Sequence, residues 1–247
     1  MSDFQGRLAE LDRVFGERGL ARVPRMAQAG WEGRVGGRHC AISVAPQKRT
    51  RYAGEVRVRQ QIGYRLRVEL ETSVRTRLFF VRGAVASNPL VRLIYRLRRQ
   101  AVLVAPAALP GFSVVTSDAT WAHGFLAQPA AMAATAELVA DLATPTFAGS
   151  VYFSPTSERG MLYYGSPTIQ LEEVTAERAL RVIERLTGIA ATAERLPAPQ
   201  VAVQIGAFGR FSEKHPALLV IGLLGCALVA LGGMALVVLT LAAVLSR

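Results

Sequence analysis

The chain has 247 residues, a formal net charge of +11 and 51% apolar residues. Its two cysteines, Cys40 and Cys226, are too few and too far apart for a disulfide framework, which fits a reducing compartment. The first residues, MSDFQGRLAELDRVF, include acids and show helical spacing, so they do not predict a cleaved secretory signal.

The first expected element is a helix near the start of the chain. Ser2 or Asp3 can cap it. Its apolar positions recur at helical spacing and favour core packing: Phe4, Leu8, Leu11, Val14 and Phe15. Two strands are expected next, over 31–35 and 39–44, on either side of a Gly36-Gly37 turn that accepts positive φ.

An arginine-rich antiparallel meander is the clearest strand signal. Apolar and charged residues alternate at period two over 64–71, which predicts one buried and one charged face. Neighbouring strands are expected through Val56 and Val58 and through Val74 to Phe80. The polar positions on these three strands are Arg57, Arg59, Arg65, Arg67, Arg75 and Arg77.

A basic amphipathic helix should follow, capped by Ser87 or Asn88 with Pro89 at its first position. One face is expected to hold Leu90, Val91, Ile94 and Leu97, opposite Arg92, Arg96, Arg98 and Arg99. Between Lys48 and Arg99 there are 14 basic residues against three acidic ones.

The second half is less basic. Residues 101–111 are apolar and contain two prolines, which favours a loop or a boundary between two lobes. We expect a strand over 112–116, a short turn capped by Ser117 or Asp118, a helix over 132–142, two strands over 147–153 and 161–164, and a closing helix over 174–193.

The stretch from Ala217 to Leu245 contains no charged residue and exceeds the roughly 20 apolar residues that a helix needs to cross a bilayer. We therefore expect an α+β domain over 1–195, a Pro- and Gly-containing tether over 196–215 and a transmembrane helix over 216–246. With a single hydrophobic segment there, the soluble domain is expected to face the cytoplasm, in agreement with Arg210 and Lys214 on the near side.

Small residues recur along one stripe of this predicted helix and favour close packing against another helix. They are Gly222, Gly225, Cys226, Gly232 and Gly233, with Val229 on the same stripe. The alternative is that glycine is simply common in transmembrane helices. With no ionisable residue in the span, the pattern does not favour a proton or ion path.

The basic strands and helix allow three readings. They can bind anionic lipid head groups or an acidic partner subunit, or they can be an ordinary solvated surface. Nucleic acid is disfavoured because aromatic residues are not interleaved with the arginines on the charged strand face.

Signals for catalysis are weak. His39, His123 and His215 are scattered, and adjacent His39 and Cys40 point to opposite faces of a strand. Asp118, Trp121 and His123 can line a pocket, but a helix cap and a core tryptophan explain the first two equally well. No nucleotide, phosphate or metal motif is present in the sequence, so no cofactor is expected.

Together these patterns predict an α+β fold, with an antiparallel meander sheet and flanking helices, on one C-terminal transmembrane helix. The expected role is a non-catalytic accessory, scaffold or assembly subunit of a membrane complex. The alternatives are a peripheral tether or sensor that binds anionic lipid, and an enzyme of unrecognised type using the second half of the domain.

Overall fold

A computed structural model describes residues 2–25, 28–53, 56–82, 88–140, 150–156 and 158–201. All of them belong to one unit of the chain, residues 1–203. The predicted transmembrane helix lies outside the described residues. Within the described part of the chain, no helix has the length and apolar character that crossing a membrane would require.

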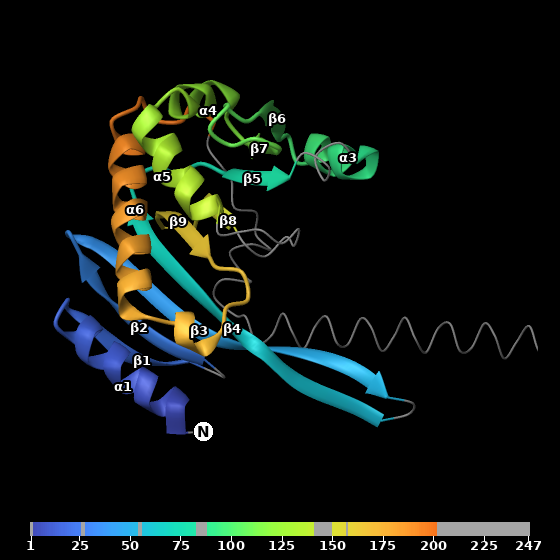
Figure 1. The fold of residues 1–247 in the computed structure, drawn as a ribbon. Coiled ribbons are helices and arrows are strands. Elements are labelled where there is room, and N and C mark those ends of the chain that lie inside the picture. Colours follow the sequence, from blue (N-terminus) through green and yellow to red (C-terminus); the bar gives the residue numbers. More distant parts are fainter. Residues whose placement is uncertain are drawn as a thin grey trace, which may run out of the picture. The chain divides into compact units, whose positions relative to one another are not determined.

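The centre of this unit is a nine-stranded sheet in which every neighbouring pair is antiparallel (Figure 1). The order of its strands is β1-β2-β3-β4-β9-β8-β5-β7-β6. They are β1 (Leu20–Arg25), β2 (Gln28–Val35), β3 (Arg38–Ala53), β4 (Val56–Thr72), β5 (Leu78–Arg82), β6 (Ala101–Val104), β7 (Phe112–Thr116), β8 (Ser150–Pro155) and β9 (Gly160–Gly165).

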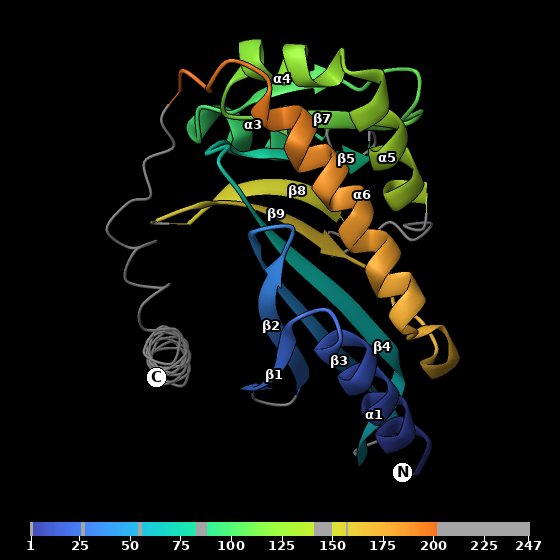
Figure 2. The ribbon, with the colours of Figure 1, turned by 90° about the vertical axis from the view of Figure 1, so that its left-hand side faces the viewer.

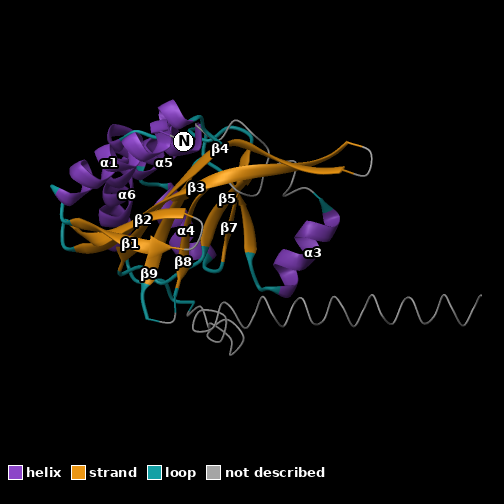
Figure 3. Ribbon diagram, turned by 90° about the horizontal axis from the view of Figure 1, so that it is seen from below, coloured by secondary structure: helices purple, strands orange, loops and turns teal. Residues whose placement is uncertain are grey.

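The described helices lie on both sides of the sheet (Figures 2 and 3). They are α1 (Ser2–Gly16), α3 (Pro89–Leu97), α4 (Ala119–Leu126), α5 (Pro129–Ala140) and α6 (Ala176–Glu194), with a short 3-10 helix η1 (Leu171–Glu173). Figure 3 shows α1, α5 and α6 on one side of the sheet and α3 on the other. The fold is therefore α+β, as the sequence predicts.

The main core lies between the sheet and α1, α4, α5 and α6. Helix α6 begins where the hydroxyl of Thr175 accepts a hydrogen bond from the backbone N–H of Arg178 (3.2 Å), and it buries one apolar stripe against β4 and β9. At the two ends of the core, Phe15 packs edge-on against Trp31, and Trp121 stacks on Phe125. Burial of these rings and the aliphatic residues between them supplies the main driving force for folding.

The expected helix near the start, the hairpin at Gly36-Gly37 and the later strands and helices are confirmed, with shifted boundaries. The predicted meander is correct only in part. Its first two strands are one 17-residue strand, β4, and β9 and β8 lie between β4 and β5. Residues 73–77 are not in a strand, and 101–104, expected as a loop, form edge strand β6, while β1 was not predicted.

Candidate functional site

The predicted arginine-rich face of the meander is divided by an irregularity in β4. Gln47 pairs with Gly63 but Lys48 pairs with Gln61, so Ile62 is an extra residue on β4. One extra residue reverses which side chains share a face of the sheet. The register therefore places Arg59 on the face opposite to Arg65 and Arg67, so the expectation of one continuous arginine face is wrong; the side chain of Arg57 lies outside the described part.

Beyond this irregularity, the β3–β4 hairpin is a two-stranded ribbon. Among the described residues, its positions before Gln47 and after Gly63 join the larger sheet, whereas those between pair only with each other. Residues 47–62 contain five basic residues and one acidic residue, Glu55. The described side chains from Lys48 to Thr50 and from Val58 to Ile62 are exposed, including two large apolar ones, Val58 (45%) and Ile62 (41%).

Arg65 and Arg67 lie on the sheet face opposite α6, beside a lateral row of Glu69, Tyr163, Tyr152 and Phe79. The rings of Tyr152 and Tyr163 are stacked, with centroids 4.8 Å apart. Burial raises the pKa of Glu69, against the charges of Arg25 and Arg67, and burial together with the charge of Glu69 raises the pKa of Tyr152.

Arg65 is half-buried on this face. Burial and then the charge of Arg67 lower its pKa, and its Nε atom is buried without a hydrogen-bond partner among the described residues. Charge and aromatic rings therefore meet on this face, where the sequence predicted charge alone.

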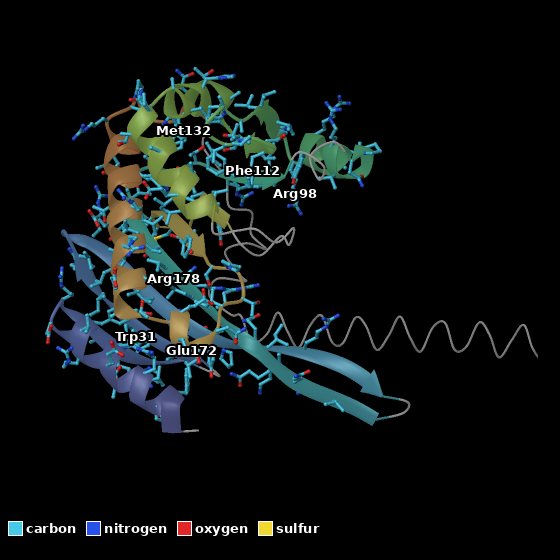
Figure 4. All side chains as sticks on the ribbon, viewed as in Figure 1. Trp31, Arg98, Phe112, Met132, Glu172 and Arg178 are labelled. Carbon is cyan, nitrogen blue, oxygen red and sulfur yellow. The ribbon has the colours of Figure 1, made fainter. Side chains whose placement is uncertain are left out.

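Helix α3 also lies on this side of the sheet, where Tyr95 packs edge-on against Phe79 with ring centroids 5.9 Å apart. Tyr95 is 7% exposed, whereas Leu93 is 53% and Leu97 76% exposed. Leu97 of the predicted apolar face is therefore exposed, whereas Val91 of that face is half-buried, and the side chains of Leu90 and Ile94 lie outside the described part. Arg92, Arg96, Arg98 and Arg99 are exposed, as expected, and Figure 4 shows Arg98 just after α3, well away from Trp31 of β2.

Of the seven large apolar side chains that the described region exposes, two lie on the hairpin, two on α3, two on strand β6 beside α3, and one, Val201, at the end of the described chain. Val58 and Ile62 belong to the hairpin, and four more belong to α3 and its neighbour β6: Leu93, Leu97, Val102 (37%) and Val104 (89%). Figures 1 and 3 both show α3 and the hairpin end projecting on the same side. Cationic and apolar groups side by side are typical of docking surfaces.

The remaining predicted arginines are placed elsewhere. Arg77 lies between β4 and β5, where its backbone N–H donates to Ser117 Oγ (3.2 Å). Arg75 borders a cavity of about 490 Å³ that also contacts Arg38 and Glu194. In this cavity both oxygens of Glu194 accept hydrogen bonds from the Arg38 guanidinium (2.5 Å each), so the cavity contains a structural ion pair.

Three residues considered for catalysis lie close together at α4, but each has different surroundings. Asp118 caps α4, Trp121 is in the core and His123 is exposed. Tyr163 and Tyr164 occupy opposite faces of β9. No group of three or more His, Cys, Asp or Glu side chains suited to a metal ion occurs among the residues that the structure describes.

Asp118 has a structural task. Its Oδ1 atom accepts from Trp121 N–H (2.9 Å), and Oδ2 accepts from the N–H groups of Gln200 (2.7 Å) and Val201 (3.1 Å). Burial acts to raise the pKa of Asp118, but these donors, with that of Thr120, outweigh it and lower the pKa. The carboxylate thus fixes the last described residues to the start of α4.

The predicted helix-packing residues, Gly222, Gly225, Cys226, Gly232 and Gly233, lie outside the described residues, and that prediction stands untested. Signals for the sites that were missed are present in the sequence. Gly63 (φ +145°) beside Ile62 marks the strand irregularity, and Leu93 and Leu97, four residues apart, mark the exposed face of α3.

The chain is similar to a solved structure but to no known family. No known protein family and no curated protein matched the sequence. Among solved structures, the chain is similar to the mycobacterial trehalose monomycolate transport factor A, TtfA, with 10% sequence identity, 81% of this chain and 100% of that chain covered, and a TM-score of 0.48. A likeness at this level carries no functional argument.

Proposed function

We propose that this protein is a non-catalytic accessory or assembly subunit of a larger membrane complex, held at the bilayer by residues 217–245 and facing the cytoplasm. The observation that carries the proposal is the joint exposure of cations and large apolar side chains on α3 and the β3–β4 hairpin. Apolar side chains that are gathered on one exposed surface and bordered by polar groups mark interaction sites, whereas singly exposed ones are ordinary.

The hairpin is the element best suited to dock a partner protein. An isolated two-stranded ribbon is at best marginally stable in water, because it has neither a third strand nor a core beneath it. A partner surface would supply both. The excess of basic residues over 47–62 favours an acidic partner, while Val58 and Ile62 supply apolar contact.

A non-catalytic role is supported by the way the domain uses its ionisable groups. Among the described carboxylates, Asp118 and Glu194 are the ones with clearly lowered pKa values. Both accept hydrogen bonds that hold structural elements together. Glu194 does line the cavity beside Arg75, but both of its oxygens are already engaged, by Arg38, Thr72 and Ser73, which favours a structural role over a catalytic one.

The complex can be tested by extracting the full chain from membranes in mild detergent and measuring its mass in the native state. The expected result is a defined assembly larger than the monomer. A lone monomer with no copurifying subunit would contradict the proposal.

Two sets of variants assign the contacts. Arg49→Glu with Arg59→Glu should dissociate a partner that docks on the hairpin, and Gly225→Leu with Gly233→Leu should weaken helix association without preventing membrane insertion. Arg13→Glu on α1 is the charge control, since Arg13 is also exposed and forms an i, i+4 ion pair with Glu17 on another element. Dissociation by the control as strongly as by the hairpin variant would reject the hairpin as the docking element.

A further inference from the structure

Among the described side chains of helix α3, Tyr95 is the buried one and makes the contact with the domain. Tyr95 packs on Phe79, and the i, i+4 pair Leu93 and Leu97 faces away from that contact, with more than half of each side chain exposed. Arg92 and Arg96, also an i, i+4 pair, are exposed next to the leucines. The side of α3 that its own domain leaves free is therefore amphipathic.

The end of α3 supplies a second, independent observation. Gln100 N–H donates to Tyr95 O and Arg99 N–H donates to Arg96 O (2.9 Å each), which is the Schellman termination. The residue at its left-handed position is normally glycine, but here it is Arg99, with φ +53° and an exposed side chain. Arg99 is the one described non-glycine residue with positive φ. A side chain retained at a conformational cost suggests a function for that side chain.

An anionic lipid surface matches both the exposed leucines and the exposed arginines of this region. Lipid phosphates can bind the guanidinium groups of Arg92, Arg96 and Arg99, and the acyl boundary just beneath them can receive Leu93 and Leu97. Val104, 89% exposed on the adjacent strand β6, adds to the same apolar contact. An acidic protein surface would match the charges, but it would have to offer an apolar pocket in register with the leucines.

The chain also makes such contact geometrically accessible. Fifteen residues separate Val201 from Ala217, where the predicted membrane span begins. Fully extended, a segment of this length reaches about 50 Å. A tether with this upper limit keeps the domain within reach of the bilayer at a high local concentration.

We propose that the free side of α3, formed by Leu93, Leu97, Arg92 and Arg96, rests on the anionic leaflet of the membrane that residues 217–245 span, together with Arg99 just beyond the end of the helix. This inference depends on the membrane anchor of the proposed function, but not on the existence of a partner subunit. It assigns α3 to lipid and leaves the hairpin for protein.

The test uses the full chain with Cys226→Ser, reconstituted into vesicles. Leu97→Cys is labelled with an environment-sensitive fluorophore, and nitroxide lipids quench it from within the bilayer. Cys40 is fully buried and so does not compete for the label. Glu177→Cys on α6 is the matched control, because its side chain is 81% exposed and remote from α3.

In vesicles containing phosphatidylglycerol, label 97 should be quenched several-fold more than label 177, and high salt or phosphatidylcholine alone should remove the difference. Arg92→Ala with Arg96→Ala should also remove most of it. Arg99→Gly is the variant that cannot act by unfolding: it should raise the unfolding midpoint and still weaken the lipid contact, by about fivefold.

Equal quenching at both labels, or quenching at 97 that ignores anionic lipid, would overturn the proposal. So would protection of label 97 in lipid-free detergent, which would indicate a second copy or a protein on α3. If the lipid contact fails while the native complex persists, only this inference is lost. If the chain does not float with vesicles at all, the anchor and with it the proposed function are lost as well.

Discussion

One carboxylate, that of Glu194, joins the end of α6 to the sheet in addition to the apolar packing, and replacing Glu194 with Gln should measurably weaken the fold. The carboxylate of Glu194 accepts hydrogen bonds from both terminal guanidinium nitrogens of Arg38, from the hydroxyl of Thr72 (2.9 Å) and from the backbone N–H of Ser73 (2.9 Å). The hydrogen bonds from Arg38 are the largest cause that lowers its pKa, from 4.5 to about 2, and they outweigh the opposing effect of burial.

This shift sets an upper limit on the effect. One pKa unit corresponds to about 1.4 kcal/mol, so the shift is equivalent to roughly 3 kcal/mol of folding stability at neutral pH. The side chains of Arg38 and Glu194 remain 22% and 20% exposed, and solvent screening reduces the value. Since Gln can keep part of the hydrogen bonding, we expect Glu194→Gln to lower the free energy of unfolding by about 2 kcal/mol.

The pH dependence provides a sharper test than the magnitude. Because the pKa of Glu194 in the folded chain lies below its ordinary value, the stabilisation is fully present above about pH 4.5 and is lost as the pH falls toward 2. The gap in stability between wild type and Glu194→Gln should therefore close over that range.

The measurement is urea unfolding of the full chain in mild detergent, followed by the fluorescence of its two tryptophans, Trp31 and Trp121, both buried in the described domain. Glu177→Gln is the matched control on the same helix, since its pair with Arg181 is exposed and should contribute less than about 0.5 kcal/mol. An effect of Glu194→Gln no larger than that of the control, or one unchanged down to pH 2, would refute the argument.

Three further outcomes follow from other contacts. Gly63→Ala should destabilise the domain by about 2 kcal/mol or more, because a Cβ atom there would lie 2.6 Å from the carbonyl oxygen of Ile169. Gly188→Ala in α6 is the contrasting change, since a Cβ atom there meets nothing within 4 Å and should stabilise the helix slightly. The same urea assay measures both variants. Burial, and to a lesser extent the charge of Glu69, raises the pKa of the Cys40 thiol to about 12. A thiol reagent at pH 8 should therefore modify Cys40 only after the chain unfolds, and rapid modification of the folded chain would contradict this. Asp118→Ala should cost about 1–2 kcal/mol and open residues 200–201 to limited proteolysis, and an unchanged cleavage pattern would show that the cap does not hold them.

The sequence predicted local elements well because their signals are local. Alternation over 64–71, the Gly36-Gly37 turn and the apolar spacing in α6 each depend on residues close together in the chain. The order of strands was not predictable in the same way. β8 and β9 insert between β4 and β5, although β5 ends at residue 82 and β8 begins only at residue 150. No short-range pattern encodes a pairing over that separation.

The docking surface was predicted in composition but not in arrangement. Counting arginines located the basic segment, yet the extra residue at Ile62 reversed the faces within it. On α3, helical spacing grouped Leu97 with residues assumed to be buried. In the structure Tyr95 makes the contact with the domain, because its ring packs edge-on against Phe79 on the sheet face that α3 covers. Periodicity identifies which residues share a face, but it does not say what that face meets.

The extra residue at Ile62 also means that evolution can change which face of the hairpin carries its basic side chains without altering the rest of the sheet. Between Lys48 and Gln61 the two strands pair only with each other among the described residues, so removing or adding one residue there would exchange the sides on which its cations lie and leave the pairing of β4 with β9 intact. A lineage can in this way change which partner its ribbon recognises while keeping every core contact. Related chains should then differ in length at this point more readily than anywhere else in the sheet.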